Sequence, residues 1–204
     1  MTNPLRQLEA AGQAVWLDYL HRKILENGEL QRLIEDDGIK GLTSNPSIFE
    51  KAIAESDAYE GRVQAALKTT DGSLSAIYER LAIADIQDAA DIFRPTWERL
   101  GGADGYVSLE VSPRLANDTE GTIADARRLW RAVDRPNLMI KVPGTPAGPP
   151  AIRRLRRSQG RGPRPWLQLR RGGGSASARR PRRTGRARAT DPARASEGRR
   201  RGTA

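Results

Sequence analysis

Four short apolar segments, separated by stretches with helical periodicity, restrict the folds open to this 204-residue chain. The apolar segments are residues 14–17, 39–44, 106–111 and 138–142. Near-continuous apolar strands that alternate with amphipathic helices are typical of a parallel sheet covered by helices. We therefore predict an α/β fold in which about four strand–helix units form half of an eight-unit barrel.

Local signals predict where the intervening helices lie. We expect helices over residues 3–11, 47–54, 59–67, 73–93 and 117–133, a short helical piece around Trp97, and the start of another helix at 151–155. A further helical segment with Leu30 and Leu33 on one face ends at Gly38, a residue that readily takes the left-handed conformation. Pro46 stands at the first position of the helix that follows it.

The composition changes abruptly near residue 153. Residues 151–204 contain 18 arginines and no lysine, with only Asp191 and Glu197 to oppose them. The first 150 residues instead carry 23 acidic and 17 basic side chains, as an ordinary acidic globular segment does. After Leu155 the large apolar residues are Trp166, Leu167 and Leu169, too few to offset the chain entropy of folding. We therefore predict two segments, a partial barrel over 1–152 and a disordered Arg/Gly/Pro/Ala-rich tail over 153–204.

Several classes of site are excluded by what the sequence lacks. The chain has no cysteine and only one histidine, His21, so thiolate chemistry and Cys- or His-based metal clusters are excluded. The first residues lack the apolar core of a signal peptide, and no apolar run is long enough to span a bilayer. We expect a cytoplasmic protein that does not act at membranes.

Four polar residues lie at the ends of the predicted strands, where parallel α/β folds place their chemistry: Asp18, Asn45, Glu110 and Lys141. An ammonium within a short strand is disfavoured unless it reaches water or is kept neutral, and a neutral lysine attacks carbonyl carbon. The alternative for Lys141 is a side chain whose stem packs while its ammonium reaches solvent. Glu110 needs a cation or hydrogen-bond donors, which Lys141 on the next strand can supply.

The other two residues also have ordinary structural explanations. Asp18 suits a general acid–base role, but it can equally be an exposed or helix-capping carboxylate. Asn45 before Pro46 is most often a helix N-cap. Three aspartates at 85, 88 and 91 are most simply a solvated helix face.

Four motifs, taken together, carry a resemblance to a known family. They are Ala14-Val15-Trp16-Leu17-Asp18, the segment 41–52 (GLTSNPSIFEKA), the segment 107–115 (VSLEVSPRL) and the segment 138–145 (LMIKVPGT). In this order they resemble transaldolase, in particular the bacterial form also found fused to glucose-6-phosphate isomerase. The resemblance covers about residues 1–152.

The resemblance implies a TIM (β/α)8 barrel enzyme of the pentose phosphate pathway whose partners are sugar phosphates. It implies transfer of a dihydroxyacetone unit from sedoheptulose 7-phosphate or fructose 6-phosphate to glyceraldehyde 3-phosphate or erythrose 4-phosphate. By motif position the resemblance implies that Lys141 would be the Schiff-base lysine and Asp18 the acid–base group for carbon–carbon cleavage. It likewise implies that Asn45 would hydrogen-bond the bound intermediate and that Glu110 would orient the water of imine formation and hydrolysis. No metal or organic cofactor is implied.

The chain departs from the family pattern after Ile152. The family's fifth strand, with an Asn, a Thr and a Leu-Leu-Phe-Ser run, is replaced by Arg153-Arg154-Leu155-Arg156-Arg157. We interpret residues from about 153 as out-of-frame translation and expect this chain to be truncated and inactive. The alternative function is non-specific nucleic-acid binding by the Arg-rich tail through phosphate charge.

Overall fold

The computed structural model describes residues 3–54, 56–157 and, for the backbone alone, 166–170. Its helices are α1 (Pro4–Ala10), α2 (Arg22–Glu26), α3 (Glu29–Asp36), α4 (Pro46–Ala54), α5 (Glu60–Leu67), α6 (Leu74–Arg99), α7 (Thr119–Val133) and α8 (Gly148–Arg157), with 3-10 turns η1 (Asp57–Tyr59) and η2 (Pro113–Leu115). Its strands are β1 (Trp16–Leu17), β2 (Gly41–Thr43), β3 (Tyr106–Glu110), β4 (Leu138–Pro143) and β5 (Trp166–Arg170).

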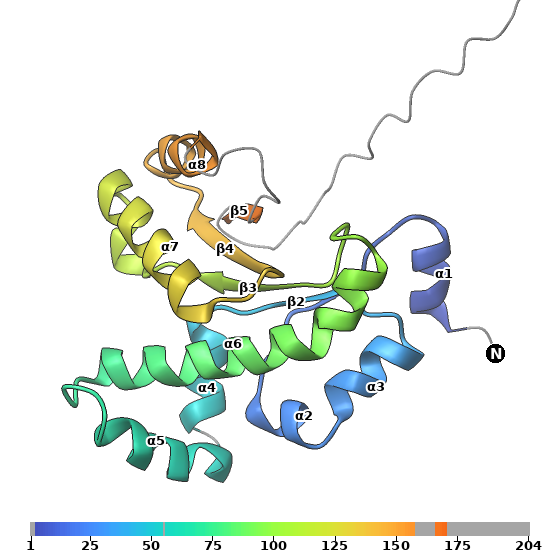
Figure 1. Ribbon diagram of the computed structural model, residues 1–204, viewed down its shortest axis with the longest axis horizontal. Helices are drawn as coiled ribbons and strands as arrows, with labels where there is room; N and C mark the ends of the chain where they lie inside the picture. The colour runs from blue at the N-terminus through green and yellow to red at the C-terminus, as the bar shows by residue number, and fades with distance from the viewer. Residues whose placement is uncertain (1–2, 55, 158–165, 171–204) are drawn as a thin grey trace, which may run out of the picture. The chain divides into compact units, whose positions relative to one another are not determined.

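All five strands form one parallel sheet in the order β1-β2-β3-β4-β5, so that each strand lies beside its predecessor in the sequence (Figure 1). A doubly wound sheet reverses direction at a switch point, whereas a barrel adds strands in sequence order. The predicted α/β class, the parallel pairing and the four expected strands are therefore confirmed, and the strand order is that of a barrel.

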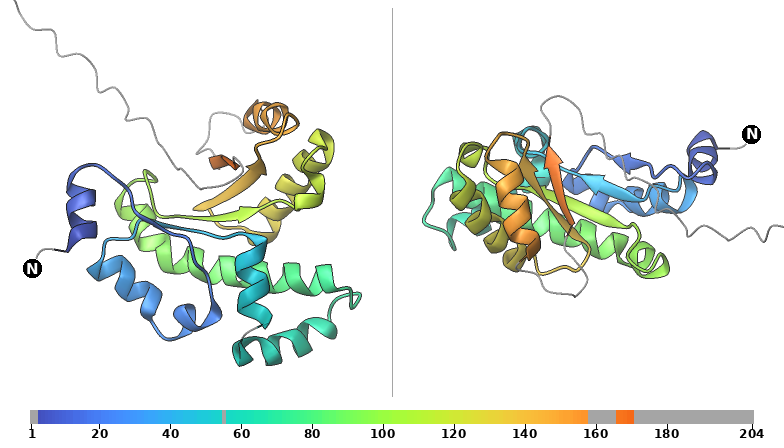
Figure 2. Two further views of the ribbon diagram at one scale, coloured as in Figure 1. Left: turned by 180° about the vertical axis from the view of Figure 1, so that it is seen from behind. Right: turned by 90° about the horizontal axis from the view of Figure 1, so that it is seen from above.

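The two faces of the sheet differ in chemistry because successive side chains in a strand point to opposite faces. One row joins the hydrophobic core that the helices cover: Leu42, Val107, Leu109, Leu138, Ile140 and Val142. The views in Figures 1 and 2 show α6 and α7 running along this sheet. The alternate row contains Thr43, Ser108, Glu110 and Lys141, with Ser108 at the middle of β3 and the others in the carboxyl half of their strands.

Gly41 occupies a position in β2 that no larger residue can fill. A Cβ atom there would lie 2.4 Å from Cε2 of Trp16, because the indole lies flat against the register-paired glycine. The indole Nε1 donates a hydrogen bond to Asp104 at 3.2 Å, which holds the ring in place. This contact joins β1 to the segment before β3.

Helix α8 confirms the start of a helix expected at 151–155, whereas β5 lies within the segment 153–204 that the sequence predicts to be disordered. Helix α8 extends to Arg157, with Gly148, Ala151 and Leu155 buried along one side and Arg154 paired with Glu120 on α7. Strand β5 then pairs in parallel with β4 over five residues. The physical reason is tertiary, since the open edge of β4 supplies backbone hydrogen-bond partners that local composition does not reveal. The remainder of the expected tail lies outside the described residues.

Helix α6 differs from the prediction at both its length and its exposed face. It continues through Pro95 to Arg99, so the piece around Trp97 belongs to the same helix.

The aspartates of α6 are paired rather than simply solvated. Asp85 is fully buried and its Oδ1 lies 2.5 Å from Nη1 of Arg22 on α2. Asp88 pairs with the same guanidinium, and Asp91 pairs with Arg135 at 2.6 Å. The face expected to be solvated therefore docks α2 and the α7–β4 connection onto α6.

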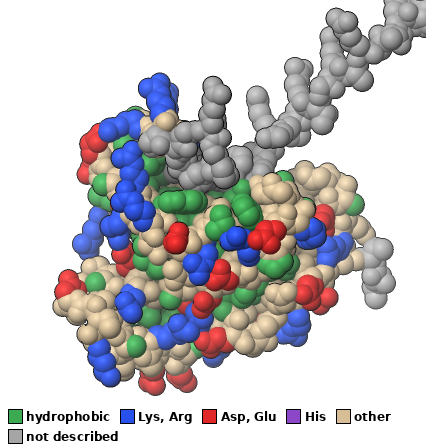
Figure 3. Space-filling model, viewed as in Figure 1, with side chains coloured by type: hydrophobic (Ala, Val, Ile, Leu, Met, Phe, Trp, Pro, Cys, Tyr) green, Lys and Arg blue, Asp and Glu red, His purple; other side chains and the backbone are tan. Residues whose placement is uncertain are grey.

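The surface of the described residues carries both signs of charge. On the face drawn in Figure 3, acidic and basic side chains are interspersed. Among the described residues no helix is both long enough and apolar enough to cross a membrane.

Candidate active site

Lys141 is a buried amine near the carboxyl end of β4. The residue is 5% exposed, so its ammonium or amine needs protein partners in place of water. Nζ donates hydrogen bonds to Oγ1 of Thr43 at 3.0 Å and to the backbone carbonyl of Ser44. The alternative interpretation, a stem that packs while the charged end reaches solvent, is wrong for this structure.

Glu110 stands directly beside Lys141 on β3. The two residues are register partners, and parallel strands direct the side chains of such partners to the same face. Glu110 Oε2 lies 3.8 Å from Nζ, and the Glu110 side chain is 5% exposed. The separation is within ion-pair range and longer than a hydrogen bond.

Asn45 adjoins this pair through the backbone. Its neighbour Ser44 provides the carbonyl that accepts from Lys141. The Asn45 side-chain Oδ1 accepts from the backbone N–H of Ile48 at 3.0 Å. Asn45 therefore caps α4, as the structural interpretation predicts, at a position next to the amine.

Asp18 follows β1 at the same edge of the sheet. Its position is one residue beyond Leu17, the register partner of Leu42, and its side chain is exposed. The structure thus brings Lys141 and Glu110 together and places Asn45 beside them. Asp18 stays exposed to solvent after β1, two strands away from β3.

Three hydroxyl residues around the amine were not predicted from the sequence. Thr43, Ser44 and Ser108 are all buried, with 3%, 0% and 0% exposure. Ser108 Oγ donates to Thr43 Oγ1 at 3.0 Å, and Ser44 Oγ donates to the Ser108 carbonyl at 2.7 Å. The alternation of side chains between the two faces of a strand could have identified two of them, because Thr43 and Ser108 interrupt apolar strands on the face that Lys141 shares.

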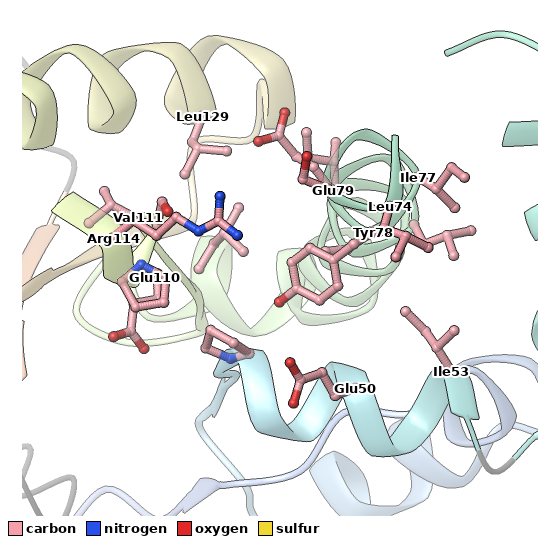
Figure 4. A pocket seen from close by; sticks show the side chains of 18 of the residues that line it. Glu50, Ile53, Leu74, Ile77, Tyr78, Glu79, Glu110, Val111, Arg114 and Leu129 are labelled. Atoms are coloured by element: carbon pink, nitrogen blue, oxygen red, sulfur yellow. The ribbon is translucent and has the colours of Figure 1, made fainter. Parts of the chain in front are cut away.

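A cavity of about 760 Å³ lies next to Glu110, between α4, α6 and the segment after β3. Figure 4 shows Tyr78 from α6 and Glu50 from α4 facing one another, with Glu110 at the border of the cavity near the end of β3. Burial, together with the carboxylates of Glu50 and Glu110, raises the pKa of Tyr78 to about 12, so its hydroxyl stays protonated at neutral pH. Lys141 is not among the residues that line this cavity, whereas its neighbour Glu110 is.

The polar groups of the site do not form a metal centre. Within residues 3–54 and 56–157 and the 166–170 backbone, no group of three or more His, Cys, Asp or Glu residues is arranged to hold an ion. The oxygens next to the amine belong to a hydroxyl and a carbonyl group, and both accept hydrogen bonds from Nζ.

Comparison with known proteins gives the family. Residues 15–161 match the family model described as Transaldolase/Fructose-6-phosphate aldolase. The chain belongs to this family. It is 50% identical over 155 residues to a transaldolase of Trichodesmium erythraeum, covering 76% of this chain and 40% of that protein. It is also 52% identical over 152 residues to a transaldolase of Thermobifida fusca, covering 74% of this chain and 41% of that one.

The match is confined to part of each relative. A transaldolase of Thiobacillus denitrificans is 50% identical over 153 residues, which cover 75% of this chain and 42% of the relative. The chain thus spans about two-fifths of the length of the curated relatives it matches. Family membership agrees with the sheet order and with the resemblance drawn from the four motifs.

Proposed function

We propose that Lys141 is the nucleophile of a transaldolase reaction that transfers a dihydroxyacetone unit between sugar phosphates. The donors are sedoheptulose 7-phosphate and fructose 6-phosphate, and the acceptors are glyceraldehyde 3-phosphate and erythrose 4-phosphate. The observation that carries the proposal is a lysine with 5% exposure at a strand end, 3.8 Å from a carboxylate, in a member of this family.

The proposed chemistry begins with imine formation. The unprotonated Nζ attacks the ketone carbon of the donor sugar, and the resulting carbinolamine loses water to form an iminium. Glu110 is proposed to hold the water that leaves here and returns at hydrolysis, since its carboxylate is close to Nζ yet beyond hydrogen-bond distance.

Carbon–carbon cleavage follows in the same proposal. The proton of the C4 hydroxyl passes to Asp18, the C3–C4 bond breaks, and its electron pair moves into the iminium to form an enamine. The aldehyde product leaves, the enamine carbon attacks the carbonyl carbon of the acceptor aldehyde, and hydrolysis of the new iminium restores the free amine. The iminium is the electron sink, so the proposal requires no metal or organic cofactor. Asn45 would hydrogen-bond a hydroxyl of the enamine, for which its capping bond to Ile48 fixes its position.

We further propose that this chain forms the imine without appreciable turnover. Among the described residues the sheet is open, with β1 and β5 as its outer strands, and the exposed Asp18 is not enclosed with the amine. A closed barrel excludes water and assembles groups from several strand ends, and proton transfer depends on that placement.

Borohydride trapping tests both statements. The purified chain is incubated with fructose 6-phosphate and sodium borohydride, and the modified lysine is located by peptide mass spectrometry. We expect the adduct on Lys141, its loss in Lys141→Met, and its retention in the matched variant Lys40→Met, which removes another buried lysine paired with Glu9. An adduct elsewhere, or none, refutes the nucleophile assignment. Steady release of glyceraldehyde 3-phosphate by the same chain refutes the absence of turnover.

The alternative, non-specific nucleic-acid binding by the Arg-rich segment, stays a prediction. Apart from α8 and the backbone of β5, that segment lies outside the described residues. A salt titration of binding to single-stranded DNA, with and without residues 158–204, tests it: binding should weaken steeply with salt and disappear on deletion.

A further inference from the structure

The hydroxyl groups of Thr43 and Ser108 form a short hydrogen-bonded chain that ends on the Lys141 amine. Thr43 Oγ1 accepts from Nζ at 3.0 Å and from Ser108 Oγ at 3.0 Å. Both donors come from other strands, β4 and β3, so one oxygen on β2 joins all three. All three residues are buried, which strengthens these bonds relative to similar bonds in water.

Two oxygens hold the amine from the β2 side. Thr43 Oγ1 and the Ser44 carbonyl each accept a hydrogen bond from Nζ. Two fixed acceptors on one side restrict the rotation of Nζ about the end of the side chain. The direction from which Nζ can approach a carbonyl carbon is restricted with it.

Ser108 acts one step away from the amine. A hydroxyl oxygen has two acceptor lone pairs, and its hydrogen rotates to suit its surroundings. Because Ser108 Oγ–H occupies one lone pair of Thr43, the other is directed toward Nζ. The backbone of Ser108 is itself held by Ser44 Oγ at 2.7 Å, so the chain closes back onto the segment whose carbonyl also binds the amine.

We propose that Thr43 and Ser108 are positioning residues that fix the direction of the Lys141 amine for attack on the sugar ketone. This inference rests on the proposed function, since it assigns how the nucleophile of that reaction is held. Neither residue exchanges a proton or bond with the substrate. Their effect is on the fraction of time that Nζ spends in the reactive geometry.

Three variants separate positioning from general structural support. Thr43→Val keeps the shape of threonine but removes the hydroxyl, Thr43→Ser keeps the hydroxyl but removes the methyl, and Ser108→Ala removes the second hydroxyl at little cost in volume. Urea unfolding of each variant establishes that the fold is retained. Trapping by borohydride is then measured as a function of fructose 6-phosphate concentration.

We expect Thr43→Val and Ser108→Ala to lower the maximal trapping rate by about tenfold or more, because displaced reacting groups lose rate steeply. The half-saturating sugar concentration should stay within about twofold of the native value, since neither residue is placed in the binding of substrate. Thr43→Ser should trap at nearly the native rate. Equal rates for the valine and serine variants, or a change in half-saturation alone, would overturn the proposal.

A second measurement needs no sugar. Trace acetylation by acetic anhydride is followed at Lys141 relative to the exposed Lys68 in the same molecule. A released amine should acetylate faster in Thr43→Val and Ser108→Ala than in the native chain or Thr43→Ser, opposite in sign to the trapping result. If the native chain fails to trap sugar while this pattern appears, the proposed function falls and the positioning stands. If acetylation is the same in all variants, the positioning inference is refuted.

Discussion

Removing the Asp85 carboxylate should be among the most destabilising single changes in the described part of the chain. Asp85 is fully buried, its Oδ1 lies 2.5 Å from Nη1 of Arg22, and its Oδ2 accepts from the Tyr59 hydroxyl at 2.5 Å. Burial raises the pKa of Asp85, while the Tyr59 and Arg22 donors act against that rise. The hydrogen bonds from Tyr59 and Arg22 therefore offset the cost of burying the carboxylate.

The structure sets the size of the effect. Asp85→Ala leaves the guanidinium of Arg22, which is 3% exposed, without its buried partner. Breaking a buried pair costs about 3–5 kcal/mol, and because Arg22 keeps its pairs with Glu26 and Asp88 we expect the lower end of that range. The Tyr59 hydroxyl loses its acceptor while still accepting from the Arg22 backbone N–H, which adds about 1 kcal/mol. For a chain of this size each kcal/mol lowers Tm by about 2–4 °C, so we expect a fall of roughly 10 °C or more.

Equilibrium unfolding in urea, followed by circular dichroism, measures this loss. The matched control is Asp88→Ala, which removes a carboxylate paired with the same Arg22 but 46% exposed, and should cost no more than about 1 kcal/mol. Replacing the pair together, with Arg22→Met and Asp85→Leu, should recover most of the loss, since no charge is left buried alone. Equal costs for the Asp85 and Asp88 variants would refute the reasoning.

Two further changes test other parts of the fold. Gly41→Ala forces a Cβ to 2.4 Å from the Trp16 ring and should lower the free energy of unfolding by about 1–3 kcal/mol in the same assay. The control Gly61→Ala, at a position on α5 with nothing within 4 Å of the added Cβ, should be neutral or slightly stabilising. A neutral Gly41→Ala would show that the ring does not lie where we describe it. Hydrogen bonds from Lys40 and Arg6 lower the pKa of Glu9 below its ordinary 4.5, so the stability Glu9 contributes is fully present above about pH 4.5 and is lost as the pH falls through the lowered value. Urea midpoints between pH 2 and pH 7 should show this acid loss in the native chain and less of it in Glu9→Gln; identical pH profiles would contradict the pairing.

The polar residues at the strand ends show which parts of the site a local sequence pattern can predict. Lys141 and Glu110 were recognisable because a charged residue inside an apolar run has few explanations, and the structure places them 3.8 Å apart. Thr43 and Ser108 were not recognised, since a hydroxyl residue in a strand is common and gains meaning only from what lies opposite it. The assignment depended on register, which pairs Thr43 with Ser108 and Glu110 with Lys141.

The same distinction explains the departures from prediction on α6 and at β5. Asp85, Asp88 and Asp91 have the spacing of an exposed helix face, and nothing near them in sequence indicates the guanidinium groups of Arg22 and Arg135 that bind them. Residues 166–170 carry too little apolar surface to fold alone, yet the open edge of β4 gives their backbone a hydrogen-bond ladder.

By itself the sequence determined the α/β class, the four strands with their intervening helices, and the amine and carboxylate at the strand ends, because apolar periodicity and misplaced charge are local properties. Only the tertiary structure decided the register of the strands, the fifth strand, the hydroxyl partners of Lys141 and the burial of Asp85. Each of these depends on contacts between residues far apart in the chain, and such contacts leave no trace in the composition of either segment.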